Sequence, residues 1–167
     1  MNRAIFFDRD GVINYEVGDY VYLIEKFRLN DGVIDCLRFF QDKGYFIFII
    51  TNQGGINKKL YSIEDVEILH EHMLNLLKDK GISIDEVYFC PHHSEYERCI
   101  CRKPDSLMIE KAMARFSINP SMSYFIGDKV TDFEAGEKAG LKSVRIIKNE
   151  NLMKNEEIIA IMNSFNE

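Results

Sequence analysis

The chain has 167 residues, a length that predicts a single domain over residues 1–167, because domains usually contain about 100–200 residues. Its formal net charge of −6 disfavours a nucleic-acid partner, since affinity for nucleic acid comes largely from lysine and arginine side chains that neutralise phosphates. The longest apolar run, residues 45–50, is far shorter than the roughly 18 residues of a membrane span, and the opening MNRAIFFDRD lacks the layout of a signal peptide, so we expect a cytoplasmic protein with no membrane partner.

Strands and helices are predicted to alternate along the chain. Short apolar runs rich in β-branched and aromatic residues predict buried strands at residues 4–7, 45–50, 87–90, 124–126 and 143–147. Helical patterns occupy residues 32–43, a stretch from residue 62 onward, and residues 106–116, 131–139 and 156–165. Such alternation implies crossover connections between parallel strands. We therefore predict an α/β fold, a three-layer sandwich in which helices cover both faces of a mostly parallel, Rossmann-like sheet.

The longest predicted helix has a start signal of its own. Ser62 and Asp65 resemble a capping box, in which each residue satisfies a backbone N–H group near the other. The helix also carries His70 and His72, which have no partner at a suitable spacing, and we expect them to be solvated or partly buried. Its apolar seam is predicted to comprise Ile63, Val66, Leu69, Met73, Leu76 and Leu77.

Acidic residues follow two of the predicted strands at their carboxyl ends, where ligands bind in this architecture. Asp8 and Asp10 follow the first strand, in the stretch DRDG, and Asp128 follows the fourth, in the stretch GDK. The turn permitted by Gly11 can bring Asp8 and Asp10 to the same opening. Clustered carboxylates repel one another unless a cation lies between them, and Mg²⁺ prefers such oxygen ligands. A turn-forming or helix-capping role is the alternative for any one of them.

Residues 89–104, FCPHHSEYERCICRKP, contain three of the four cysteines and two adjacent histidines of the chain. In a reducing compartment, clustered cysteines are better explained by a metal than by disulfides. His93 is the competing ligand to its neighbour, and reduced cysteines without a metal are the alternative. A bound ion would also fix Arg102 and Lys103 at the crevice. The pattern predicts a closed, structural Zn²⁺ site formed by Cys90, His92, Cys99 and Cys101.

Four motifs in order resemble those of the haloacid dehalogenase superfamily of phosphatases: DRDG at 8–11, Thr51, Lys103 and GDKVTD at 127–132. The resemblance covers nearly the whole chain. It implies that Asp8 attacks phosphorus to form an aspartyl phosphate and that Asp10 is the general acid and base. Thr51 and Lys103 would stabilise the transferring phosphoryl group. It further implies that Mg²⁺ is bound by Asp8, the backbone carbonyl of Asp10, and Asp128.

The cysteine-rich loop, with RDGVINYEVGDYV, EKFRLNDGV and TNQGGI, resembles the subfamily of phosphatases that act on D-glycero-D-manno-heptose 1,7-bisphosphate. The resemblance implies removal of the 7-phosphate from a small phosphorylated sugar, with Arg102 aiding recognition. The loop is nearer in length to many loops of the related histidinol-phosphate phosphatases, and DSLM after RKP departs from the heptose pattern. Histidinol phosphate is therefore the alternative substrate. A non-catalytic, zinc-stapled binding module is the alternative of another class, although intact Asp8 and Asp10 argue against it.

The segments before Thr51 and before Cys90 are too short to hold a cap domain, so short loops must grip the substrate. An open crevice suits a ligand with two anionic groups. The absence of a long exposed apolar stripe makes a monomer the expected state. Besides the catalytic groups, the residues expected to contact substrate are Arg9, Glu16, Gly18, Asp19, Asn52, Gln53, Gly54, Arg102 and Lys129.

Overall fold

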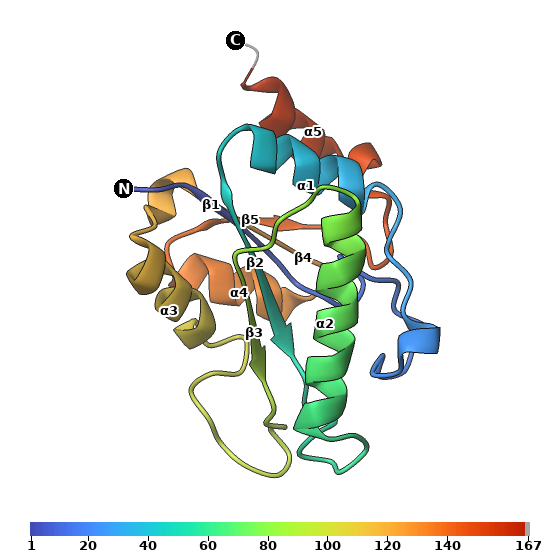
Figure 1. Ribbon diagram of the computed structural model, residues 1–167. Helices are drawn as coiled ribbons and strands as arrows, with labels where there is room; N and C mark the ends of the chain where they lie inside the picture. The colour runs from blue at the N-terminus through green and yellow to red at the C-terminus, as the bar shows by residue number, and fades with distance from the viewer. Residues whose placement is uncertain (166–167) are drawn as a thin grey trace.

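The computed structural model describes residues 1–165, and its centre is one parallel five-stranded sheet (Figure 1). The strand order is β3-β2-β1-β4-β5. The chain first adds strands on one side of β1 and then on the other, so the order reverses between β1 and β4, where crevices form in such sheets. The strands are β1 (Ala4–Phe7), β2 (Phe46–Asn52), β3 (Glu86–Cys90), β4 (Tyr124–Gly127) and β5 (Lys142–Arg145).

Helices cover both faces of the sheet, which confirms the predicted three-layer α/β sandwich (Figure 1). One face packs against α1 (Val33–Asp42), α2 (Ile63–Asp79) and α5 (Glu156–Asn163), and the other against α3 (Leu107–Phe116) and α4 (Val130–Lys138). Successive β1 side chains point to opposite faces, as the pleat of a strand requires, and join different apolar clusters. Short 3₁₀ segments connect these elements at η1 (Ile24–Lys26), η2 (Pro120–Met122) and η3 (Leu152–Lys154).

Element boundaries differ from the predicted ones by a few residues. β2 continues two residues beyond its apolar run, because Thr51 and Asn52 pair in register with Phe89 and Cys90 of β3. β5 ends at Arg145 instead of residue 147, and α5 ends at Asn163 instead of residue 165. Backbone pairing with a neighbouring strand can extend a strand through polar residues, which an apolar pattern alone does not indicate.

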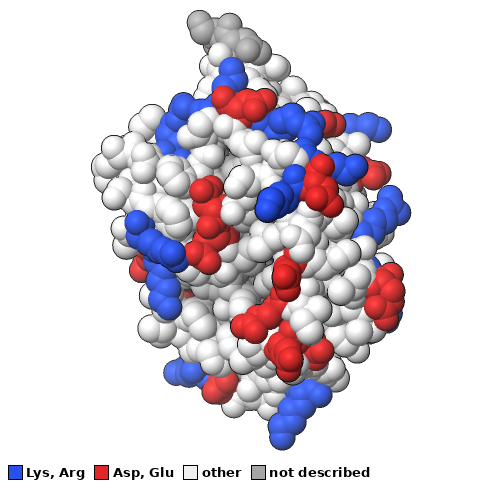
Figure 2. All heavy atoms as spheres, in the orientation of Figure 1, with Lys and Arg blue, Asp and Glu red and all other residues white. Residues whose placement is uncertain are grey.

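The start of α2 confirms the capping box and corrects the predicted seam. The Ser62 hydroxyl accepts a hydrogen bond from the Asp65 amide at 3.1 Å, and the Asp65 carboxylate accepts one from the Ser62 amide at 2.7 Å. Ile63 is 47% exposed and does not belong to the buried seam, because the first helical residue projects past the end of the core. The exposed face of α2 carries Glu64, Glu67 and Glu71, and Figure 2 shows acidic side chains over this part of the molecule.

No separate cap domain covers the carboxyl ends of the strands in residues 1–165. Between β1 and β2 the chain forms only η1 and α1, and between β2 and β3 only α2. Substrate-contacting groups must therefore come from loops and helix starts. None of the helices in the described residues is both long and apolar enough to cross a bilayer.

Candidate active site

Three carboxylates meet beyond the carboxyl ends of β1 and β4. Asp8 follows β1, Asp128 follows β4, and Asp132 lies in the first turn of α4. All three are buried, and one carboxylate oxygen of each lies within 4.8 Å of those of the other two. The Lys103 ammonium group lies 2.7 Å from Asp8 Oδ1 and 2.7 Å from Asp132 Oδ1, and it also donates to the Ile50 carbonyl at 2.7 Å. The predicted residues Asp8 and Asp128 are thus brought together by adjacent strand ends, and the loop before α3 adds Lys103.

This carboxylate cluster has the chemistry of a divalent-cation site. Asp128 Oδ1 is buried and has no hydrogen-bond partner among residues 1–165. Burial raises the pKa of the Asp8 carboxyl to about 7, and repulsion from Asp132 adds to this effect, whereas Lys103 lowers it. Gly11, with φ of +85°, leaves room beside the cluster, because a Cβ there would lie 2.9 Å from Asp128 Oδ2. A cation would satisfy the free oxygen and favour ionised Asp8, so these residues fit Mg²⁺.

Asp132 also belongs to this cluster, although the sequence pattern assigns it no separate role. Besides contacting Lys103, its carboxylate accepts a hydrogen bond from the Lys129 backbone N–H group at 2.9 Å and so caps α4. Asp132 and Asp8 therefore both hold the Lys103 ammonium group. The signal for it was present, since Asp132 is the last residue of GDKVTD, but its spacing alone does not distinguish a helix cap from a site residue.

Asp10 is held by a set of side-chain hydrogen bonds. Arg9 Nη2 donates to Asp10 Oδ1 at 2.9 Å and to Oδ2 at 3.0 Å. Asn14 Nδ2 donates at 3.1 Å and Gln53 Nε2 at 3.0 Å. Burial alone would raise the pKa of Asp10, but the charge and hydrogen bonds of Arg9, with those of Asn14 and Gln53, keep it below its ordinary value. Asp10 and Asp8 line the same small cavity of about 30 Å³, so both residues border the space in which a phosphoryl group would react.

Two residues expected to contact substrate instead support Asp10. The Arg9 side chain is 0% exposed and Gln53 is 1% exposed, so neither reaches the crevice. Gln53 Nε2 also donates to Thr51 Oγ1 at 2.8 Å, and its Oε1 accepts from the Tyr61 hydroxyl at 2.8 Å. Substrate contact by Arg9 and Gln53 stays a prediction; in this structure both are buried polar groups that find an internal partner in Asp10.

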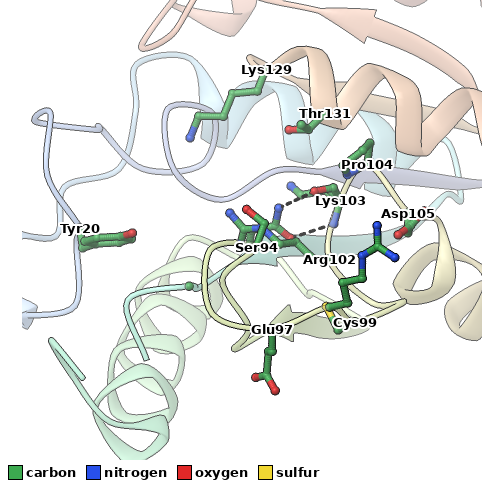
Figure 3. A pocket seen from close by; sticks show the side chains of 13 residues that line it. Tyr20, Ser94, Glu97, Cys99, Arg102, Lys103, Pro104, Asp105, Lys129 and Thr131 are labelled. Carbon is green, nitrogen blue, oxygen red and sulfur yellow. Dashed lines mark hydrogen bonds between the residues drawn. The ribbon is translucent and has the colours of Figure 1, made fainter. Parts of the chain in front are cut away.

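A crevice of about 630 Å³ opens beside these carboxylates (Figure 3). Arg102 and Lys103 line it from the loop before α3, and Lys129 lines it from the start of α4 (Figure 3). Asn52 and Gly54 line it from the end of β2. Three cationic side chains and the amide of Asn52 thus border a space open to solvent, an arrangement suited to an anionic ligand.

The Asn52 side chain holds the backbone of Lys103 within this crevice. Its Nδ2 donates to the Lys103 carbonyl at 3.0 Å, and its Oδ1 accepts from the Lys103 N–H group at 3.0 Å. The Arg102 guanidinium donates to the His92 carbonyl at 2.8 Å. The end of β2 and the loop before α3 are therefore connected by paired hydrogen bonds that fix the Lys103 backbone.

A smaller hollow of about 230 Å³ adjoins the crevice. It is lined by Asp10, Glu16, Gly18 and Asp19, so the residues predicted to contact the sugar lie together near the loop that follows β1. Glu16 lies 3.4 Å from the ammonium groups of both Lys129 and Lys148. Sequence reasoning missed Lys148, and no local pattern indicates it, because it comes from the segment after β5.

The cysteine-rich loop brings four ligand atoms together. The sulfur of Cys90 lies 3.6 Å from that of Cys99 and 3.1 Å from that of Cys101. His92 Nδ1 lies 3.5 Å from the Cys90 sulfur and 3.3 Å from the Cys101 sulfur. A tetrahedral ion with metal–sulfur bonds of about 2.3 Å separates its ligands by roughly 3.8 Å, so the donor set fits Zn²⁺. His93 is outside this cluster, and its Nδ1 accepts instead from the Glu95 amide at 3.3 Å.

A parallel sheet with this carboxylate and lysine cluster at its carboxyl ends defines a HAD-like hydrolase. A family model described as HAD-hydrolase-like matches residues 100–155. The D-glycero-beta-D-manno-heptose-1,7-bisphosphate 7-phosphatase of Haemophilus influenzae is 43% identical over 147 residues, which cover 85% of this chain and 79% of the relative. The D-glycero-alpha-D-manno-heptose-1,7-bisphosphate 7-phosphatase of Campylobacter jejuni is 40% identical over 148 residues, covering 89% and 84%.

A solved structure has the same fold. The D,D-heptose 1,7-bisphosphate phosphatase of B. bronchiseptica, complexed with magnesium and phosphate, superposes with a TM-score of 0.85 at 22% identity, covering 99% of this chain and 98% of that one. The chain belongs to the D-glycero-D-manno-heptose-1,7-bisphosphate 7-phosphatase family of HAD-like hydrolases.

Proposed function

We propose that this protein is a Mg²⁺-dependent phosphatase that removes the 7-phosphate of D-glycero-D-manno-heptose 1,7-bisphosphate through an aspartyl-phosphate intermediate. The observation that carries the proposal is the contact between the Asp8 carboxylate and the Lys103 ammonium group, which line the same small cavity, in a chain 43% identical to a phosphatase of that name. A nucleophilic carboxylate beside a fixed cation suits phosphoryl transfer, because the cation stabilises charge on the transferring group.

In the first step, an Asp8 oxygen attacks phosphorus and the bond between phosphorus and the sugar oxygen breaks. Asp10 gives its proton to that oxygen, so the sugar leaves as an alcohol. The low pKa of Asp10 belongs to the protein without substrate. A phosphoryl dianion placed beside this carboxylate raises its pKa and favours the protonated form that the step requires.

In the second step, water attacks the phosphorus of the aspartyl phosphate. Asp10, now ionised, accepts the proton of that water, and the bond between phosphorus and Asp8 breaks to release inorganic phosphate. Arg9, Asn14 and Gln53 hold Asp10 by hydrogen bonds and favour its ionised form, which this step needs. Lys103 would stabilise the transferring group, and Thr51, although 1% exposed, would contribute its backbone or hydroxyl group.

Two metals would have separate tasks. Mg²⁺ would be held by Asp8, the Asp10 backbone carbonyl and Asp128, and when bound it supplies positive charge that balances nucleophile and phosphate. Zn²⁺ would be held by four protein ligands, which leave no open position, so its task is to shape the loop that carries Arg102 and Lys103. The four zinc ligands would be Cys90, His92, Cys99 and Cys101.

Substrate choice would depend on the cations farther out in the crevice. Arg102 and Lys129 line the crevice together with Lys103, and a bisphosphate offers a second anionic group to them. The primary 7-phosphate ester can enter a narrow site while the 1-phosphate stays outside. The matched relatives include enzymes named for the beta and for the alpha anomer, so the anomer has to be tested directly.

The test compares kcat/KM for both heptose bisphosphate anomers, histidinol phosphate and fructose 1,6-bisphosphate, each with Mg²⁺. We expect a heptose bisphosphate to be preferred. Arg102→Ala should lower kcat/KM for the bisphosphate by roughly 10- to 100-fold and should lower that for a simple monophosphate ester less, because a charge-assisted contact is worth roughly 1.5–3 kcal/mol. Arg115→Ala is the matched control, since Arg115 pairs with Glu86 on the surface at 2.6 Å.

Two results would contradict the proposal. A clear preference for histidinol phosphate would replace the substrate and leave the roles of Asp8 and Asp10 standing. Equal losses on the bisphosphate and the monophosphate in Arg102→Ala would remove Arg102 from recognition of the second phosphate.

A further inference from the structure

His70 of α2 is buried against Arg9 in the loop that follows β1, contrary to the expectation that it is solvated or partly buried. His70 is only 7% exposed, and its Nε2 lies 3.1 Å from Arg9 Nη1. The imidazole also packs edge-on against Phe89 of β3, with ring centroids 5.7 Å apart. The contact joins residues 61 positions apart in the sequence, so helical spacing could not indicate it.

The direction of the hydrogen bond follows from the chemistry of its partners. An arginine guanidinium is always charged and has only donors, so His70 Nε2 must be the acceptor. His70 is then neutral and carries its proton on Nδ1. Burial, reinforced by the Arg9 charge, lowers the pKa of His70 to about 3, which agrees with a neutral ring at physiological pH.

His70 completes the set of acceptors around a buried cation. Arg9 Nη2 donates to the Val21 carbonyl at 2.6 Å and to both oxygens of Asp10, while Arg9 Nη1 donates to His70. A buried guanidinium without its full set of partners is costly and turns toward whatever acceptors remain. The imidazole therefore fixes the rotation of the group that holds the Asp10 carboxylate.

We propose that His70 is a positioning residue for the reaction: it accepts a hydrogen bond from Arg9 and thereby keeps Arg9 oriented to hold Asp10. The proposal rests on the proposed function, in which Asp10 protonates the leaving sugar oxygen. Correct placement of a general acid matters most for a poor leaving group such as a sugar alkoxide. A nitrophenolate leaves without needing a proton, so its release in a single turnover, before water attacks the aspartyl phosphate, reports on the rest of the site.

The experiment compares two His70 variants on heptose 1,7-bisphosphate and on p-nitrophenyl phosphate, with Mg²⁺. His70→Leu removes the acceptor and should lower the single-turnover rate of sugar release about 10-fold, while the single-turnover rate of nitrophenolate release stays within about 2-fold. In His70→Gln the side-chain amide oxygen can accept from Arg9, and both activities should stay within about 3-fold of wild type. His72→Leu, on the same helix, is the control: the His72 ring packs against Phe27 at 6.0 Å.

Several outcomes would overturn the proposal. Equal losses on both substrates in His70→Leu would mean that His70 only supports the fold. Full activity on both would mean that Arg9 keeps its orientation without His70. A His70→Gln enzyme as impaired as His70→Leu on the sugar phosphate would show that the acceptor is not what matters. Asp10→Asn measured beside them distinguishes the two proposals, because equal losses in the single-turnover release of both leaving groups in that variant would contradict the role of Asp10 as the acid.

A measurement on the unmodified protein does not depend on the role of Asp10. In side-chain ¹⁵N NMR, His70 should show a protonated Nδ1 and an unprotonated, hydrogen-bonded Nε2 that do not change between pH 8 and about 5.5. A proton on Nε2, or titration of His70 near pH 6.5, would contradict the contact on which the proposal stands.

Discussion

The two candidate metal sites of this molecule are built in opposite ways. The carboxylate cluster takes Asp8, Asp128 and Asp132 from three positions around the ends of β1 and β4, and all three are buried. The cysteine and histidine cluster takes its candidate ligands from the end of β3 and the loop that follows it, within residues 90–101, and of these four ligands only Cys90 is buried. One site is assembled by the sheet, and the other lies within a single segment of chain.

This difference predicts what each site needs in order to keep its shape. Lys103 and the helix-capping role of Asp132 hold the carboxylate cluster even before a cation is added. The loop between the paired zinc ligands has little to bury, since Tyr96 is 62% exposed and Ile100 is 73% exposed. We therefore expect this segment to obtain its order from an ion bound by the cysteine and histidine cluster.

The largest expected effect tests the site that the sheet assembles. Asp8→Asn should lower turnover of any phosphate ester by at least about 10⁴-fold, because the nucleophile is removed. The fold should remain, since the surrounding core is unchanged. Single-turnover phosphate release measures the chemistry, and thermal unfolding measures the fold. Detectable phosphate release at the first turnover would remove Asp8 from this role.

A smaller effect is expected when the loop site is broken. Cys99→Ser should abolish zinc retention and lower activity by roughly 10- to 100-fold, because Arg102 and Lys103 lose their fixed placement although no reacting group has changed. Elemental analysis should find about one zinc per chain in the wild type and in the control Cys36→Ala, whose cysteine lies in the core away from the loop. Full activity of Cys99→Ser without zinc would separate the loop from catalysis.

The two metals should also differ in how they leave the protein. Dialysis should remove Mg²⁺, and addition of Mg²⁺ alone should restore activity, because this ion is held through few protein oxygens and keeps several waters. Zinc should survive the same dialysis, since four protein ligands surround it. Loss of zinc at the same rate as magnesium would remove the distinction between a catalytic and a structural site.

The smallest expected effect concerns protonation of His70. The folded-state pKa of His70, about 3, lies below its ordinary value of 6.5, so the folded protein binds this proton less readily than the unfolded chain. The contribution of neutral His70 is therefore present above pH 6.5 and is lost as the pH falls. At pH 5.5 the loss amounts to about 1.4 kcal/mol.

Denaturant unfolding of wild type and His70→Gln at pH 7.5 and 5.5 checks this value. The raised pKa of Asp8 acts with the opposite sign, since a buried carboxyl that binds a proton more readily in the folded state stabilises that state as the pH falls. Only the difference between the two proteins isolates His70. An identical decline in both would show that His70 does not resist protonation.

Local signals in the sequence were sufficient for the elements and for part of the site. Each predicted strand and helix is present, because apolar runs and apolar periodicity report burial within a short window. Asp8 and Asp128 were identifiable because polar residues that follow buried strands of a parallel sheet meet at one edge, and Lys103 was indicated by the family motifs that the chain resembles. The cysteine ligands were identifiable because they are close together in the chain.

Only the tertiary structure decided what each polar side chain does within the site. Arg9 lies beside Asp8 and Asp10 in the sequence, yet its side chain is buried under α2 because His70 and the Val21 carbonyl accept its hydrogen bonds there. Likewise His92 and not His93 joins the cysteines, and Lys148 reaches Glu16 across 132 positions. Hydrogen bonds and ion pairs depend on atoms brought within about 3 Å by packing, and residue type and spacing carry no record of those distant partners.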